Sequence, residues 1–280
     1  MNQSEAAGWL GRLELGFEAI AGETRLVRRT HEGPLRVQKA FFPEGRAVPH
    51  VVLLHPPGGV VGGDRLEIDV EVGAQASALI TTPAAQKLYR SSGPEALQRN
   101  RLRVGRGGAL EWLPGETIAF DGACVATTTR VELEEESAFI GWDLTCYGRP
   151  SSGSAFETGR LRQRFEIHRG KLPLLIERAE VGGGSAALGA PWGLRGPVMA
   201  TLYAVPRVAT ELAGLVDRLR ERLRASAREA SAVSALGDLL VVRASGTRLE
   251  HARAALIECW QALRPAILAR DATLPRIWAT

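Results

Sequence analysis

The sequence contains few cysteines and no long apolar stretch. Its 280 residues include only three cysteines, Cys124, Cys146 and Cys259. They are too few and too widely separated for a disulfide framework, and such sparse use is typical of a reducing compartment. No run of about 18 apolar residues occurs, and the polar residues 1–5 lack the apolar core of an export signal. We therefore expect a globular cytoplasmic protein with no membrane contact.

Lysine is also scarce, although the chain is basic. The lysines are Lys39, Lys87 and Lys171, so almost all of the 35 basic residues are arginines. The 31 acidic residues are interleaved with them, and the net charge is only +4. Such spacing lacks the basic block of a nucleic-acid-binding protein, and we expect no nucleic-acid partner. A nucleic-acid binder remains an alternative, which would show a steep salt dependence of binding.

Signatures of catalysis are missing too. Gly58 and Gly63 have the spacing of a phosphate loop, but residues 64–65 are Asp-Arg where Lys and Ser/Thr are required. No nucleophile elbow, C-x-x-C or H-E-x-x-H motif occurs. His50 and His55 point to opposite faces of one strand and cannot chelate an ion from that strand alone. We expect no enzyme, with a metal-dependent hydrolase as the rival class.

The first two hundred residues have the pattern of β-strands. Aliphatic and acidic residues alternate along 66–72, and a similar period of two runs through 125–133 and 161–167. Residues 51–54 are continuously apolar, which is typical of a strand covered on both faces. The sequence therefore predicts a mainly β fold.

A weak repeat suggests how these strands are arranged. Similar residues recur about thirty positions apart in three places, beginning at Val72, Val104 and Leu133. Stacked β-coils produce such a repeat, and so does an ordinary two-sheet sandwich with hairpins of similar length. We therefore expect a β-rich body of two stacked sheets, with a β-helix-like arrangement and a sandwich both open.

The last eighty residues differ from this body. A strand is predicted at 198–205, a helix at about 208–229 and a second strand at 238–243. A final helix follows, so the C-terminal segment is predicted to be a strand-helix-strand-helix unit. We expect a β-rich body over 1–197 and this α/β unit over 198–280, packed together as one compact chain.

The final helix has recognisable end signals. Thr247 and Glu250 have the spacing of a capping box, in which the side chains bond each other's backbone N–H groups. Pro265 is expected to end or kink the helix. Its apolar stripe includes Leu249, Leu256 and Trp260.

The chain then ends on an apolar tail at 274–278. Arg and Trp are the residue types most often found at the energetic centres of interfaces. We therefore expect Arg276 and Trp278, together with the stripe, to contact a protein partner. Docking of the tail on the protein's own core is the equally weighted alternative.

Three acidic residues occupy unusual positions. Asp64 follows a glycine-rich stretch, Asp143 lies beside a tryptophan in an apolar segment, and Glu177 ends an apolar run. Each alone suits a turn cap or a surface ion pair. As a group they could provide weak oxygen ligands along a passage for a divalent cation.

Five segments, taken in order and spacing, resemble the urease accessory protein family UreD, called UreH in some organisms. They are 33–39 (GPLRVQK), 55–64 (HPPGGVVGGD), 87–91 (KLYRS), 110–114 (LEWLP) and 274–278 (LPRIW). The second segment is long and unusual, and the resemblance runs from Trp9 to the C-terminus. Leu88 and Gly115 depart from the residues common in the family, but neither change removes a charge.

The resemblance implies an assembly scaffold without its own catalytic centre. Such proteins bind a UreF-like partner, which recruits a UreG-like GTPase, and the complex inserts nickel into apo-urease. The resemblance implies no tightly bound cofactor, only nickel in transit along an internal route. By this resemblance Asp64, Asp143 and Glu177 are the candidate residues along that route.

Overall fold

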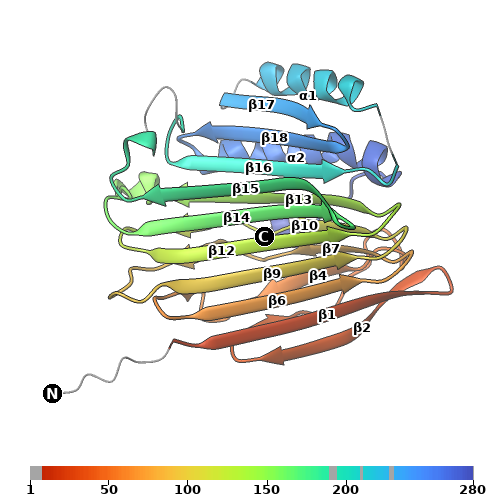
Figure 1. Cartoon of the computed structure of the whole chain (residues 1–280), viewed down its shortest axis with the longest axis horizontal. Coiled ribbons are helices and arrows are strands. Elements are labelled where there is room, and N and C mark those ends of the chain that lie inside the picture. The colour runs from red at the N-terminus through yellow and green to blue at the C-terminus, as the bar shows by residue number, and fades with distance from the viewer. Residues whose placement is uncertain (1–7, 189–193, 209–210, 227–229, 280) are drawn as a thin grey trace.

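Two β-sheets stacked face to face form the protein. The computed structural model describes residues 8–188, 194–208, 211–226 and 230–279. One sheet lies nearer the viewer in Figure 1 and is called the front sheet; the other is the back sheet. Among the described residues, no helix is both long and apolar enough to cross a membrane.

The front sheet has seven strands. In spatial order they are β15 (Leu172–Gly182), β14 (Arg160–Arg169), β12 (Cys124–Leu133), β9 (Ala96–Val104), β6 (Arg65–Val72), β1 (Leu10–Ile20) and β2 (Glu23–Glu32).

The back sheet follows a longer path. In order it contains β17 (Ala230–Leu236), β18 (Leu239–Gly246), β16 (Val198–Val205), β13 (Ala138–Tyr147), β10 (Ala109–Leu113), β7 (Ser77–Thr81), β4 (His50–Leu54) and β3 (Arg36–Val37). Short strands β5 (Gly59–Val60), β8 (Gln86–Leu88) and β11 (Thr117–Ala119) extend it at the side, through pairing of β11 with β13.

The chain winds through these sheets as a stack of coils. It passes from β6 to β7 to β8, then from β9 to β10 to β11, and then into β12 and β13. Strands at the same place in successive coils pair in parallel: β6 with β9, β7 with β10, and β8 with β11. Val72 lies opposite Val104, which lies opposite Leu133. The weak sequence repeat is therefore a real structural repeat, and the β-helix-like arrangement is confirmed for this part of the chain.

The period-two patterns predict the core between the sheets. The aliphatic residues of 66–72 all point inward and are buried, and residues 51–53 are buried as expected for a strand covered on both faces. β16 hydrogen-bonds to β13, so the segment from residue 198 continues the back sheet of the body. The two-sheet prediction is confirmed.

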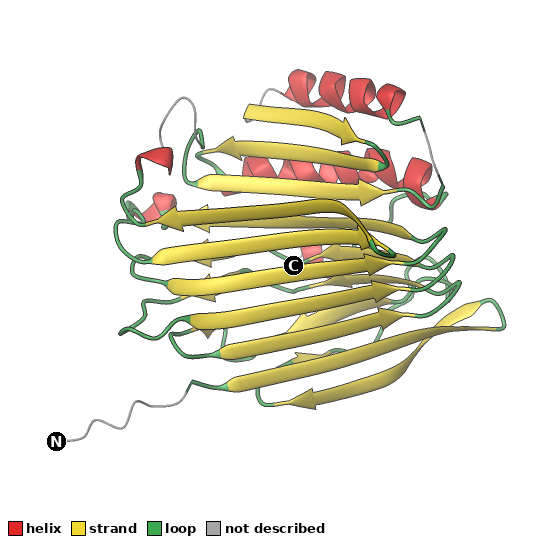
Figure 2. Cartoon of the chain, viewed as in Figure 1, coloured by secondary structure: helices red, strands yellow, loops and turns green. Residues whose placement is uncertain are grey.

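Two helices cover the other face of the back sheet (Figure 2). Helix α1 (Ala213–Ser226) contacts β17, and α2 (Leu249–Leu268) contacts β13, β16 and β18. Their apolar sides form a second core with the back sheet. Short 3-10 turns η1 (Pro150–Ser152), η2 (Ala186–Leu188) and η3 (Arg276–Ala279) complete the described elements.

The structure corrects three details of the C-terminal prediction. β17 was not predicted, so the order is strand-helix-strand-strand-helix. The prediction of a capping box is wrong. Helix α2 begins after Arg248 with no side-chain cap, and Glu250 accepts a bond from Arg248 instead of reaching Thr247. Pro265 lies inside α2, which ends three residues later with the Ala269 N–H bonded to the Pro265 carbonyl. The expected helix at 208–229 is α1, although residues 209–210 and 227–229 lie outside the described residues.

Candidate functional site

A cavity of about 170 Å³ lies between the two sheets. Its front wall comes from inward-pointing residues of β9, β12 and β14, and its back wall from β10, β13 and the loops beside them. Five of the inward side chains in this front wall are polar, and they stand beside apolar side chains such as Leu161 and Phe165. These polar residues are Gln98, Asn100, Thr127, Thr129 and Gln163.

Amide and hydroxyl groups in this wall bond one another. The Gln86 side-chain amide donates to Gln98 Oε1 at 2.7 Å. The Asn100 amide donates to Thr129 Oγ1 at 3.0 Å. The cavity wall therefore presents neutral oxygen and nitrogen groups at fixed positions.

Asp143 supplies a carboxylate to the cavity from β13. Its Oδ1 accepts a hydrogen bond from Thr145 Oγ1 at 2.9 Å, and Gln163 Nε2 donates to Oδ2 at 3.2 Å. Gln163 is oriented in turn by the Tyr147 hydroxyl, which donates to its Oε1 at 3.0 Å. Burial raises the pKa of Asp143, and the charge of Glu177 raises it further. No cationic side chain among the described residues forms an ion pair with this carboxylate.

Glu177 lies next to the cavity rather than in its wall. Its Oε2 accepts hydrogen bonds from Arg243 Nη2 at 2.7 Å and from the Tyr203 hydroxyl at 3.3 Å. The Tyr203 ring stacks on Phe165, a cavity residue, with ring centroids 4.3 Å apart. The charge of Glu177 raises the pKa of Asp143, so the two carboxylates are close enough to interact electrostatically.

Asp64 has a different environment. It is buried, and its two carboxylate oxygens accept backbone N–H bonds from Trp9 at 2.9 Å and from Val61 at 3.0 Å. It therefore caps a turn, which is the alternative that the sequence left open. Asp64 acts electrostatically on His55, whose side chain lines the cavity and whose pKa is lowered by burial.

The three predicted acids do not form one cluster. Asp143 and Glu177 interact across the interior, and Asp64 is linked to the cavity only through His55. Within the described ranges, no group of three or more His, Cys, Asp or Glu side chains is arranged to hold a metal ion.

Comparisons with known proteins cover nearly the whole chain. The family described as "UreD urease accessory protein" matches residues 10–279. The chain belongs to this family. It is 44% identical to the urease accessory protein UreD of Dechloromonas aromatica (strain RCB) over 275 residues, 97% of this chain and 95% of that protein. It is also 44% identical to UreD of Azoarcus sp. (strain BH72) over 274 residues, 98% of this chain and 95% of that protein.

In this UreD-family chain the apolar C-terminal tail is docked on the protein itself. The Trp278 indole donates to Thr81 Oγ1 at 2.9 Å and packs against Trp142 and Trp260, with ring centroids 5.4 and 5.6 Å away. Trp260 and Leu256 are fully buried on the side of α2 that packs against the back sheet. Of the other candidate partner residues, Arg276 is exposed and Leu249 is half-buried.

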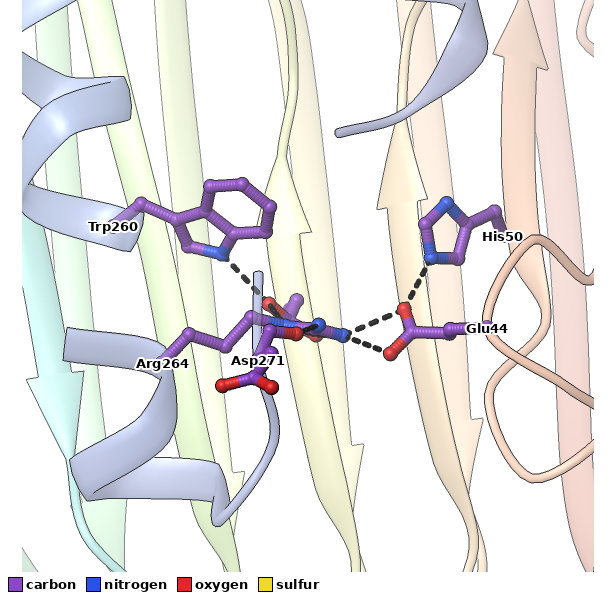
Figure 3. A network of polar contacts seen from close by, with 6 residues as sticks. Glu44, His50, Trp260, Arg264 and Asp271 are labelled. Atoms are coloured by element: carbon purple, nitrogen blue, oxygen red, sulfur yellow. Dashed lines mark hydrogen bonds and ion pairs between the residues drawn. The ribbon is translucent and has the colours of Figure 1, made fainter. Parts of the chain in front are cut away.

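A buried polar network fixes α2 to the rest of the protein (Figure 3). The side chains of Arg264 and Trp260 extend from α2. The Arg264 guanidinium donates to both carboxylate oxygens of Glu44, at 2.6 and 2.8 Å. His50 also donates to Glu44, at 2.6 Å. Arg264 and Trp260 also donate to Glu111 of β10, at 3.0 and 2.7 Å. Burial alone would raise the pKa of Glu44, but the bonds from His50 and Arg264 outweigh it and the pKa is lowered.

The polar side chains in the cavity wall were not predicted from the sequence. Gln163 stands between Leu161 and Phe165, at a position where the alternation expects an apolar side chain. Gln98 and Asn100 occupy the same kind of position on β9. Polar residues at inward positions of several strands were the available signal.

Proposed function

We propose that this UreD-family protein is a scaffold chaperone of urease maturation that, with UreF-like and UreG-like partners, helps insert nickel into apo-urease. In this proposal it has no catalytic centre of its own, and the GTPase partner hydrolyses GTP. Nickel is the cargo and passes through the cavity between the sheets without becoming a resident cofactor.

The chemistry of Asp143 carries this proposal. Its carboxylate borders the cavity with only neutral hydrogen-bond donors around it, from Thr145 and Gln163. A divalent cation beside this carboxylate would offset the energetic cost of burying its negative charge. Carboxylate, amide and hydroxyl oxygens bind such a cation weakly, and His55 adds an imidazole, which is a suitable nickel ligand. Weak binding suits an ion that must leave again.

Asp64 and Glu177 remain proposed residues along this route. Asp64 would act through His55, since its own oxygens are held by backbone N–H groups. Glu177 would act through Asp143, because its charge favours whatever neutralises that carboxylate. Neither residue is proposed to bind nickel tightly.

The partner contacts are proposed for the C-terminal region. Leu249 and Arg276 offer surface there, whereas Leu256, Trp260 and Trp278 would support that surface from below. We place the complex in the cytoplasm, and the free thiols of Cys124, Cys146 and Cys259 are consistent with a reducing compartment.

The function is tested in cells that produce urease with its accessory proteins. Deleting this chain should leave urease abundant but poor in nickel, as measured by metal analysis of purified urease. Full nickel loading in its absence would contradict the proposal.

The route is tested with Asp143→Asn, which removes the charge and keeps the shape. We expect less nickel per urease molecule, with the UreF-like partner still recovered in a pull-down. Asp69→Asn is the matched control, because Asp69 lies on the outward face of β6. Equal nickel loading in both variants would reject the role of the cavity.

A further inference from the structure

The outward face of the front sheet carries a shallow basin, on the opposite side of that sheet from the cavity. Side chains alternate along each strand, so Gln98, Thr127 and Gln163 face the cavity while their neighbours Arg99, Thr128 and Arg164 face outward. The basin has a volume of about 560 Å³. It lies on the opposite side of the sheet from the cavity, so its role is independent of the function proposed above.

The strand register brings several arginines into one row. Thr128 of β12 lies opposite Arg99 of β9 on one side and opposite Arg164 of β14 on the other. Arg164 in turn lies opposite Arg178 of β15. Neighbouring strands are about 4.8 Å apart, so the Cα atoms of Arg99 and Arg164, two strands apart, are separated by about 10 Å. The small side chains of Ala126 and Thr128 between them leave the floor open.

Two of these arginines lack an acidic partner. Arg162 is paired with Glu95, and Arg164 with Glu166. Within the described part of the chain, Arg99 and Arg178 form no ion pair or side-chain hydrogen bond. Glu67 lies opposite Arg99 on β6, but it is bonded to Arg12 at 3.1 Å.

The pairing across the row is unfavourable by itself. Arg164 and Arg178 carry like charges on directly opposite positions, an arrangement that destabilises a sheet. A negatively charged ligand between them would turn this repulsion into attraction. Guanidinium groups match carboxylates especially well, because two parallel N–H groups can bond both oxygens.

We propose that this basin, centred on Arg99, Thr128, Arg164 and Arg178, binds an acidic segment of a partner protein. An extended segment crossing the strands would place alternate carboxylates about 7 Å apart, a spacing that fits between and beside the arginines. Glu180 on the rim and the carboxylates bound to Arg162 and Arg164 interrupt the positive charge, so the basin offers separate positions for single carboxylates and not the unbroken basic track that a continuous phosphate backbone requires. The described residues lining the basin also include no aromatic side chain on which a base could stack.

The test uses the full-length protein and a fluorescent peptide of alternating glutamate and serine. The double variant R99Q/R178Q removes the two unpaired charges. We expect it to weaken peptide binding about tenfold or more, because it removes two charge-assisted contacts. Its melting temperature should not fall, since neither arginine stabilises a neighbouring carboxylate.

The matched control is R29Q/R218Q, which removes two exposed arginines from β2 and α1 and changes the net charge equally. It should bind the peptide as the parent does. Equal weakening in both double variants would mean unspecific attraction and would overturn the proposal.

Two other results would also overturn it. A single-stranded RNA of similar length that binds more tightly than the peptide, with loss in R99Q/R178Q, would identify a nucleic-acid site. Self-association in sedimentation that R99Q/R178Q abolishes, without peptide binding, would identify a second copy of this chain as the occupant.

Discussion

Arg264 of α2 and Glu111 of β10 lie 153 positions apart in the chain and form a buried ion pair with a nitrogen–oxygen distance of 3.0 Å. The Arg264 side chain is 0% exposed and that of Glu111 is 3% exposed. Arg264 also reaches Glu44, which precedes β4. One guanidinium therefore holds the final helix to two separate parts of the β-body.

Replacing Arg264 should strongly destabilise the fold. In Arg264→Met two carboxylates lose their cation inside the protein, and breaking a buried pair in this way costs about 3–5 kcal/mol. The free energy of unfolding from urea denaturation measures the effect. Adding Glu111→Gln should recover part of the loss, because it removes one of the unpaired charges while a side-chain oxygen can still accept from Trp260. No recovery would show that packing, rather than charge, dominates.

Asp143→Asn should make the protein more stable at neutral pH. Burial raises the pKa of Asp143 in the folded state, so folding favours the protonated form. Stability is then lost as the pH rises from the usual aspartate value of about 3.9 to the raised pKa, and the loss is about 1.4 kcal/mol for each pH unit in that window.

The asparagine variant lacks this loss. The stability difference between variant and parent should therefore grow over that pH window and stay constant above it. Asp69→Asn provides the control for the charge change. A stability difference that does not vary with pH would mean that Asp143 is ionised at no cost in the parent.

Asp64→Ala should reduce stability, because the backbone N–H groups of Trp9 and Val61 lose their acceptors. An unsatisfied buried group costs about 1–3 kcal/mol. Trp9 and Val61 are exposed residues and their bonds to Asp64 are partly buried, so we expect a cost toward the lower end of that range for each. Asp64→Asn keeps one oxygen acceptor and should fall between Asp64→Ala and the parent in thermal melting. If Asp64→Ala instead melts like the parent but delivers less nickel, Asp64 belongs to the route and its capping role is minor.

Local patterns predicted the strands of this fold but not their partners. The alternation in 66–72 and the apolar run at 198–205 correspond to β6 and β16. Parallel and antiparallel neighbours bury the same alternating face, so the coil stack could not be separated from a sandwich. β17 was missed because it consists mostly of alanine and serine, with only Val233 buried.

Only part of the candidate site could be predicted from the sequence. Asp143 was chosen because a charged residue in an apolar segment needs a reason, and it does border the cavity. The role of Arg264 could not be predicted, because the helical pattern does not distinguish a buried arginine from one that faces water. Its partners Glu111 and Glu44 are distant in sequence, and no local pattern connects them.

The docked tail makes a prediction that separates a structural role from a partner interface. Removing residues 274–280 uncovers Trp142 and Trp260 and removes the indole bond to Thr81. Truncating a buried aromatic residue costs about 3–5 kcal/mol, and Trp278 is only half-buried, so we expect about half of that. The deletion should therefore lower the melting temperature.

Two single variants resolve the tail's contribution. Trp278→Phe keeps most of the ring packing but loses the bond to Thr81, so its melting temperature should fall between those of the deletion and the parent. Arg276→Gln should leave the melting temperature unchanged, because Arg276 is exposed. Weaker recovery of a UreF-like partner with Arg276→Gln would therefore mark Arg276 as an interface residue. If the deletion abolishes partner binding at an unchanged melting temperature, the tail serves the partner, and its contacts with Trp142 and Trp260 contribute little to folding.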